Sequence, residues 1–220
     1  MISSTNRAST ARGGFTLIEL MVVIGILTTL AALSAGAYFR VMTSQQLKRS
    51  EATLKKIHTG LSSQWSAAVD DANTDIKNGK AGVGTNARTA YMQAILRQQF
   101  PMTFAEAVTK YPELSGVSLP TVAGQESSIC LFLALSRARR GANFSPDEIG
   151  KETVVNVQLS GKTFSYLVDA WGTPIKLNRP ADLANPGAEL FILSAGPDKT
   201  FGSNDDINSH LLLKEGQRGN

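Results

Sequence analysis

One acidic side chain interrupts a long apolar stretch near the N-terminus. Glu19 stands inside GFTLIELMVVIGIL, and residues 20–39, which follow it, contain neither a charge nor a proline. A charged group at the centre of a membrane helix costs about 3 kcal/mol on insertion scales, so it usually has a partner or a function. A carboxylate close to the membrane interface can instead stay hydrated, and Glu19 by itself leaves both interpretations open.

The apolar stretch has the length of a membrane span. Twenty helical residues rise about 30 Å, the thickness of the hydrocarbon core. Arg7 and Arg12 precede the span, and residues 1–14 contain no acidic residue. The positive-inside tendency therefore predicts a cytoplasmic N-terminus and an exported C-terminal part. A secretory signal peptide usually has a shorter apolar region followed by a small-residue cleavage site, so we expect this span to be retained.

The string RGGFTLIELMVVIGILTTLAAL, residues 12–33, resembles the class III signal of type IV prepilins and pseudopilins. In that family a short basic leader ends in Gly and is followed by Phe, with a Glu at the fifth position of the mature chain. The resemblance implies that a prepilin peptidase cuts after Gly14 and that the new N-terminal Phe15 is methylated. It also implies a role in assembly for Glu19. We hypothesise that Glu19 pairs with the Phe15 amine of a neighbouring subunit, a gain that depends on good geometry because both charges are desolvated.

A second group of acidic residues lies near the C-terminus. Asp198, Asp205 and Asp206 are separated mainly by small and polar residues. Ca²⁺ takes six to eight oxygen ligands from carboxylates, backbone carbonyls and water, and a loop of this composition can supply them. The spacing is not that of an EF-hand, because Thr200 stands at the third position counted from Asp198. Composition alone is more typical of a solvated acidic turn.

Two C-terminal segments, DAWGTPIKL and LFILSAGPDKTFGSNDDI, resemble the Trp-Gly segment and the calcium-binding loop of major pseudopilins of type II secretion systems. In the first, Trp171 is expected to anchor in the core and Gly172 to form a turn. The second implies a Ca²⁺ site made by the side chains of Asp198, Asp205 and Asp206 and by the carbonyls of Ala195 and Thr200.

The rest of the composition argues against several other functions. The formal charge is +4 and the basic residues are scattered, so no nucleic-acid partner is expected. Cys130 is the only cysteine and lies in an apolar run, which predicts a buried thiol and excludes an intramolecular disulfide. His58 and His210 have no matched nucleophile or ligand set in the sequence, so we expect no enzyme. The arginines at 137, 139 and 140 are expected near a helix C-terminus rather than in an anion site.

The expected architecture is α+β, with a long N-terminal helix packed on a small C-terminal antiparallel sheet. Beyond the span, apolar residues recur at helical spacing and predict an amphipathic face on the protein's own domain: Leu47, Leu54, Ile57, Leu61, Trp65 and Ala68. The segments are a leader at 1–14, a membrane or fibre-core helix at 15–39, its amphipathic continuation at 40–69, a loop and helical insertion at 70–150, and the sheet with the acidic loop at 151–220. Within them we expect a loop at 70–88, helices at 89–100, 103–111 and 127–140, and strands at 154–159, 164–168, 174–177 and 190–194.

The resemblance favours a structural subunit of a secretion pseudopilus. Its partners would be the prepilin peptidase, other copies and minor pseudopilins in a helical fibre, and an inner-membrane assembly platform. The chain would cross the bacterial inner membrane once, with its C-terminal domain periplasmic, before entering an extracytoplasmic fibre. A type IV pilin for adhesion, motility or DNA uptake is the alternative, although most such pilins carry a C-terminal cysteine pair. A membrane-anchored extracytoplasmic domain with binding or hydrolytic activity is the alternative of another class.

Overall fold

A computed structural model describes residues 15–139, 142, 144–183, 185 and 189–218. The chain divides into two compact units, Met1–Ser44 and Gln45–Asn220. Gly14 and the rest of the predicted leader lie outside the described residues. The fold class predicted from the sequence is confirmed: a long N-terminal helix is followed by helical segments and then by small antiparallel sheets, as in a pilin-like α+β protein.

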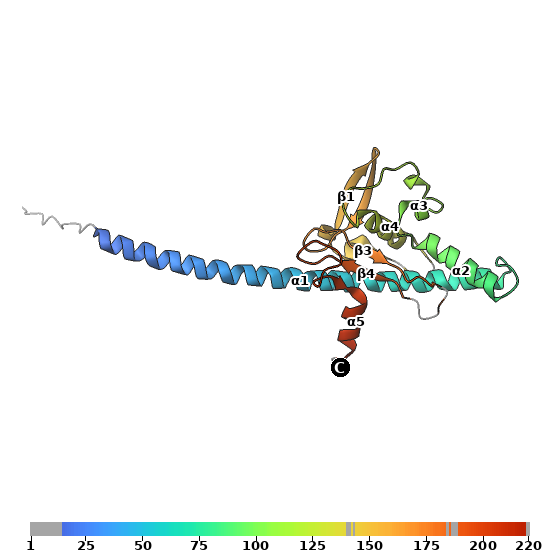
Figure 1. Ribbon diagram of the computed structural model, residues 1–220, viewed down its shortest axis with the longest axis horizontal. Coiled ribbons are helices and arrows are strands. Elements are labelled where there is room, and N and C mark those ends of the chain that lie inside the picture. The colour runs from blue at the N-terminus through green and yellow to red at the C-terminus, as the bar shows by residue number, and fades with distance from the viewer. Residues whose placement is uncertain (1–14, 140–141, 143, 184, 186–188, 219–220) are drawn as a thin grey trace, which may run out of the picture. The chain divides into compact units, whose positions relative to one another are not determined.

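The N-terminal helix α1 runs from Leu17–Lys77 and takes part in both units (Figure 1). In the first unit every side chain described is exposed, including the apolar ones. The helix continues without a break through Gly25 and Gly36. By length and composition it is apolar enough to cross a membrane.

In the second unit, α1 forms one side of the core. Leu54, Ile57 and Leu61 are fully buried, as their spacing of three and four residues predicts. Leu47 is 39% exposed, so the buried face begins later than the apolar pattern does. Residues 70–77, expected in a loop, are helical, and the connection to the next helix is correspondingly shorter.

Three further helices precede the sheets: α2 Thr85–Gln99, α3 Phe104–Ala107 and α4 Gln125–Ser136. Short 3₁₀ turns lie at Pro112–Leu114, Pro146–Glu148 and Lys151–Thr153. The helices expected at 103–111 and 127–140 are both shorter than expected at their C-terminal ends. Helix α4 ends because Arg137 adopts an extended backbone conformation.

The expected hairpin is confirmed, with β1 Val154–Leu159 antiparallel to β2 Lys162–Leu167. Ser160 and Gly161 form its two-residue turn with φ values of 50° and 76°, the positive φ pair that a type I′ turn requires. A separate sheet contains β3 Lys176–Asn178, β4 Phe191–Ser194 and β5 Ile207–Asn208 in the order β3-β4-β5. The expected strands are thus divided between two small antiparallel sheets, with an isolated bridge between Val168 and Pro174 outside the named strands.

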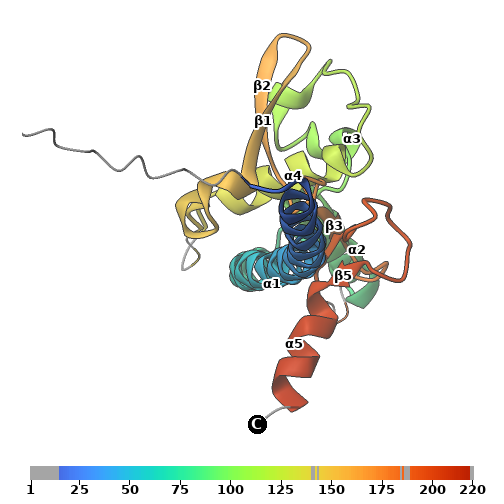
Figure 2. The same ribbon diagram turned by 90° about the vertical axis from the view of Figure 1, so that its left-hand side faces the viewer.

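Helix α4 joins the two sheets through a pair of buried serines. Ser128 Oγ donates to the carbonyl of Leu167 on β2 and accepts from its N–H, at 2.7 and 2.9 Å. Ser127 makes the same pair of hydrogen bonds to Leu177 on β3, at 3.3 and 3.0 Å. The chain then ends in α5 Ser209–Arg218, which extends from the second unit in the direction opposite to the β1–β2 hairpin (Figures 1 and 2).

Candidate functional site

The start of α1 places the first predicted site residues. Phe15 precedes the helix and its side chain is 85% exposed. Thr16 is the residue before the first helical turn, and its backbone N–H and its hydroxyl both donate to Oε2 of Glu19 at 2.8 Å. The N–H of Glu19 donates back to the Thr16 hydroxyl at 3.3 Å. These reciprocal bonds form a capping box, which satisfies N–H groups that would otherwise have no partner at the helix start.

The capping box gives Glu19 a structural role that the sequence interpretation missed. Its signal, a Thr followed three residues later by a Glu just before an apolar run, is present as TLIE. Oε2 is occupied by Thr16, whereas Oε1 of Glu19 accepts no hydrogen bond from any described residue. The carboxylate can therefore cap its own helix and still offer one oxygen to a cation.

The first unit also presents a continuous apolar surface. Its large hydrophobic side chains are exposed along the helix, among them Leu17, Ile24, Leu33 and Phe39. Exposed apolar patches of this extent are rare on soluble monomers and mark membrane or protein contacts. The first unit therefore needs lipid or other apolar helices around it.

The acidic loop, residues 195–206, carries the second predicted site. Asp198 uses its carboxylate to accept the N–H of Thr200 at 2.8 Å, and Asp206 accepts the N–H of Gly202 at 2.8 Å. The hydroxyl of Ser203 donates to Asp205 and lies 3.5 Å from Asp206, so those two carboxylates converge. Asp205 also accepts the N–H of Asp198 at 3.2 Å. The hydrogen bond from Ser203 is the main cause that lowers the pKa of Asp205.

An aromatic contact fixes the acidic loop to the rest of the domain. The ring of Phe201 packs against Gly124, where a Cβ atom would come within 2.8 Å of it. The ammonium group of Lys176 lies 4.8 Å from the centroid of the same ring. Gly124 also has φ +80°, a conformation that disfavours any side chain. Gly124 is thus required both by the backbone and by the approach of the loop.

The donor chemistry of the acidic loop suits Ca²⁺, but its arrangement does not gather the three carboxylates. Within the described part of the chain, no group of three or more His, Cys, Asp or Glu side chains is placed to hold a metal ion. Asp198 is turned toward the N–H of Thr200, while Asp205 and Asp206 face Ser203. The loop as folded is a hydrogen-bonded turn, and a cation shell would require these bonds to be exchanged.

The DAWG segment forms a turn, as expected, with the side chain of Asp169 buried beneath it. Asp169 accepts the N–H groups of Trp171 and Thr173 at 3.0 and 2.8 Å, and the hydroxyl of Ser194 donates to it at 2.6 Å. Trp171 packs against the core, which confirms it as an anchor. The sequence interpretation missed Asp169, whose carboxylate ties this turn to β4.

Both histidines have partners that lie far away in the sequence. Nδ1 of His58 on α1 lies 3.0 Å from the hydroxyl oxygen of Ser209 at the start of α5. That hydroxyl also accepts the N–H of Ile192 at 3.0 Å, and Ser209 is fully buried. This pair therefore fastens the start of α5 and does not present a nucleophile. His210 lies 3.2 Å from a carboxylate oxygen of Glu189.

Cys130 is buried as predicted, and burial raises the pKa of its thiol.

Arg139 closes the C-terminal end of α4. Its guanidinium donates to the Ala134 carbonyl at 2.8 Å and to the side chain of Gln64 on α1 at 2.6 Å. It also lies 4.8 Å from the ring centroid of Phe100. This geometry agrees with the expectation of cations at the negative end of a helix dipole.

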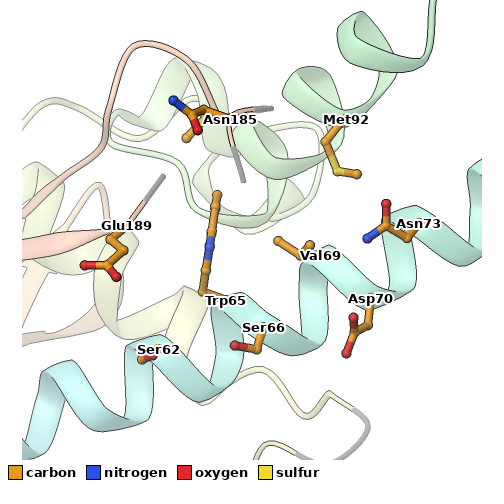
Figure 3. A pocket seen from close by; sticks show the side chains of 10 residues that line it. Ser62, Trp65, Ser66, Val69, Asp70, Asn73, Met92, Asn185 and Glu189 are labelled. Carbon is orange, nitrogen blue, oxygen red and sulfur yellow. The ribbon is translucent and has the colours of Figure 1, made fainter. Parts of the chain in front are cut away.

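A groove of about 440 Å³ lies beside the C-terminal part of α1, in the second unit (Figure 3). Its apolar lining comes from Trp65 and Val69 on α1, Met92 on α2 and Leu183. Asp70 and Glu189 add carboxylates. The sequence interpretation did not identify it, because its residues come from segments far apart in the chain.

Comparison with known proteins recognises the N-terminal segment. Residues 9–35 match the family model of the prokaryotic N-terminal methylation motif. No curated protein and no solved structure matches the chain. The chain therefore carries a type IV prepilin-like signal, which implies processing by a prepilin peptidase and pilus-like assembly with other subunits. Together with the apolar helix, the signal suggests membrane anchoring.

Proposed function

We propose that this protein is a structural subunit of a pilus-like fibre, a pseudopilin of a type II secretion-like export machine. The observation that carries the proposal is the methylation motif at residues 9–35, which spans the junction between Gly14 and Phe15. It opens a helix whose apolar side chains are exposed along the first unit, where they require a surrounding of lipid or other helices. The subunit resides in the inner membrane with its second unit in the periplasm. An assembly platform then incorporates it into the fibre. Minor pseudopilins are further partners.

Cleavage after Gly14 changes the charge at the start of the chain. It removes Arg7 and Arg12, so the formal charge falls from +4 to 4 − 2 = +2, and it leaves 220 − 14 = 206 residues. It also creates an amine on Phe15, which is then methylated. Glu19 of a neighbouring copy receives this amine through Oε1, the oxygen that the capping box leaves free. An ion pair between desolvated groups is favourable only with good geometry. It therefore stabilises two subunits only when they are correctly aligned.

Labelled fibres test the proposed assembly. The full chain, carrying an epitope at its C-terminus, is expressed in the source cells, and surface or sheared fibres are imaged with a label against the epitope. If the proposal is right, the label should be found along the whole length of each fibre. Absence of the label from every fibre, with the cleaved protein retained in the membrane, would instead support a membrane-anchored extracytoplasmic domain.

The secretion assignment rests on the resemblance of the DAWG segment and the acidic loop to those of major pseudopilins. A strain that lacks the protein is expected to retain exported proteins in the periplasm. Loss of adhesion, motility or DNA uptake with normal secretion would favour the type IV pilin alternative.

For the acidic loop we propose Ca²⁺ binding by the side chains of Asp198, Asp205 and Asp206 and the carbonyls of Ala195 and Thr200. The support is the oxygen-rich composition and the placement of all five residues in one loop held by Phe201. When bound, Ca²⁺ would cross-link the loop and stabilise the end of the domain.

Calcium binding is tested by melting the detergent-solubilised full chain with Ca²⁺ and with a chelator. Binding raises the midpoint as the free Ca²⁺ concentration exceeds the dissociation constant. Asp206→Asn should abolish the rise, whereas Asp147→Asn, an exposed acid outside the loop, should leave it intact. An unchanged midpoint together with no heat of Ca²⁺ binding in calorimetry would remove the claim.

A further inference from the structure

The groove beside α1 has the size and lining of a small-ligand site. Its volume of about 440 Å³ falls within the range of ligand pockets, roughly 300–1,000 Å³. Figure 3 shows Trp65 standing out from α1 into the groove, with Glu189 on one side of it and Val69 and Met92 on the other. The ring of Trp65 is held by Phe100, whose centroid lies 5.4 Å away. The Trp65 ring is therefore held in position without a bound ligand.

The charge of the groove is of one sign. Among the described residues that line it, Asp70 and Glu189 are the charged side chains, and no Lys, Arg or His is present. Glu189 has His210 near one oxygen, at 3.2 Å. Asp70 forms no ion pair within the described part of the chain. Two carboxylates on the rim disfavour an anion and attract a cation.

We propose that this groove binds an organic cation, an ammonium or guanidinium group carried on a short apolar chain. The cation lies against the Trp65 ring, where the ring quadrupole attracts it. Asp70 and Glu189 supply the opposite charge. The apolar chain packs on Val69 and Met92, and methionine adapts well to ligands of different shape. This site is independent of the cleavage junction and of the acidic loop.

The first experiment compares a cation with a neutral molecule of the same shape. The full chain in non-ionic detergent is titrated with n-butylammonium and, separately, with n-butanol, at ionic strength kept constant with NaCl, while tryptophan fluorescence is recorded. The proposal expects a saturable change for n-butylammonium and at least tenfold weaker binding of n-butanol, with the affinity for the cation falling as salt is raised. Equal binding of the two would overturn the proposal in favour of a neutral ligand, and no saturable change with either would remove the site.

Variants locate the binding on the groove. Asp70→Asn and Glu189→Gln should each weaken n-butylammonium binding severalfold, and both side chains are exposed enough for the fold to survive the change. Asp147→Asn changes the net charge equally at an exposed position outside the groove and should leave the affinity unchanged. A loss with Asp147→Asn as large as with the groove variants would refute a local site.

A second arm distinguishes a free amine from a lysine side chain of a protein partner. Doubly blocked lysine, N-acetyl-lysine methylamide, presents the same ammonium group on a peptide backbone. Tighter binding of blocked lysine than of n-butylammonium assigns the groove to a protein side chain. Weaker binding assigns it to a free amine, and failure of both to bind overturns the proposal.

Discussion

Replacing Glu19 separates its two roles, the cap of its own helix and the proposed partner of a neighbour's amine. Glu19→Ala removes both roles. Glu19→Gln keeps a carbonyl oxygen that can accept from Thr16, because Gln also serves at this position of a capping box, but it removes the charge. Thr16→Ala is the matched control, since it removes the hydroxyl that donates to Glu19 at 2.8 Å and leaves the carboxylate charged.

The two roles differ enough in magnitude to be told apart. Loss of a helix cap costs about 1 kcal/mol, roughly a fivefold change in an equilibrium constant. Removing one partner of a desolvated ion pair costs roughly 3–5 kcal/mol, because the other charge is left unpaired, which lowers the association constant by about a hundredfold to several thousandfold. If the ion pair forms, Glu19→Gln should therefore assemble almost as poorly as Glu19→Ala. Thr16→Ala should assemble within about tenfold of the unmodified chain.

The assay measures the fraction of cleaved subunit recovered in sheared fibres by quantitative immunoblot. The mass of each variant is checked first, because a subunit that is not cleaved cannot report on assembly. Glu19→Gln protein that is cleaved and builds fibres at near-normal yield would refute the ion pair. Cleaved Glu19→Ala protein that also builds fibres at normal yield would remove any role of Glu19 in assembly.

Three further predictions concern the second unit, and each is measured on the full chain in detergent. Burial lowers the pKa of His58 in the folded chain, so as the pH falls below the ordinary value near 6.5 the unfolded chain takes up the proton before the folded chain does. The free energy of unfolding should therefore stay constant above about pH 6.5. Below that pH it should fall by at most about 1.4 kcal/mol per pH unit. His58→Gln should flatten this melting profile, and an unchanged slope would contradict the assignment. Leu61→Ala, at a fully buried site, should cost about 2–5 kcal/mol in denaturant unfolding, whereas Leu47→Ala should cost less than about 0.5 kcal/mol; equal losses would refute the buried face. Gly124→Ala should strain a backbone at φ +80° and displace Phe201, so amide hydrogen exchange in the acidic loop should accelerate, and unchanged exchange would argue against this anchor.

Local patterns predicted the elements whose partners are close or whose period is regular. Leu54, Ile57 and Leu61 repeat at helical spacing, and burying that face needs no knowledge of what covers it. The hairpin is similarly local, because Ser160 and Gly161 suit the two-residue turn between strands rich in β-branched residues. The methylation signal is also contained in one short segment, so it could be read from the sequence alone.

The last turns of α1 are polar, so the sequence pattern predicts too early an end for this helix. The Asp and Asn content of residues 70–77 predicts a loop, yet Ala72 is buried four residues beyond the buried Ala68 and continues the same face. The polar side chains simply occupy the outer side of the helix. Small apolar residues at that spacing were the available signal.

The start of α5 and the groove could not be predicted, since their contacts join distant segments. Ser209 bonds to His58 on α1 and to Ile192 on β4, and neither partner is visible from local periodicity. The groove likewise needs Trp65 on α1 beside Glu189, which follows β3. Composition predicts the acidic loop, but the anchor of that loop, the contact of Phe201 with Gly124, depends on tertiary structure.

The central claim is that cleavage between Gly14 and Phe15 releases a subunit that enters a fibre. Intact-mass and N-terminal analysis of the protein purified from sheared fibres tests it most directly. The account predicts a chain that begins at Phe15, carries one additional methyl group and has lost the 14 leader residues. Fibres that contain only the uncut chain, or a chain cut elsewhere, would contradict it.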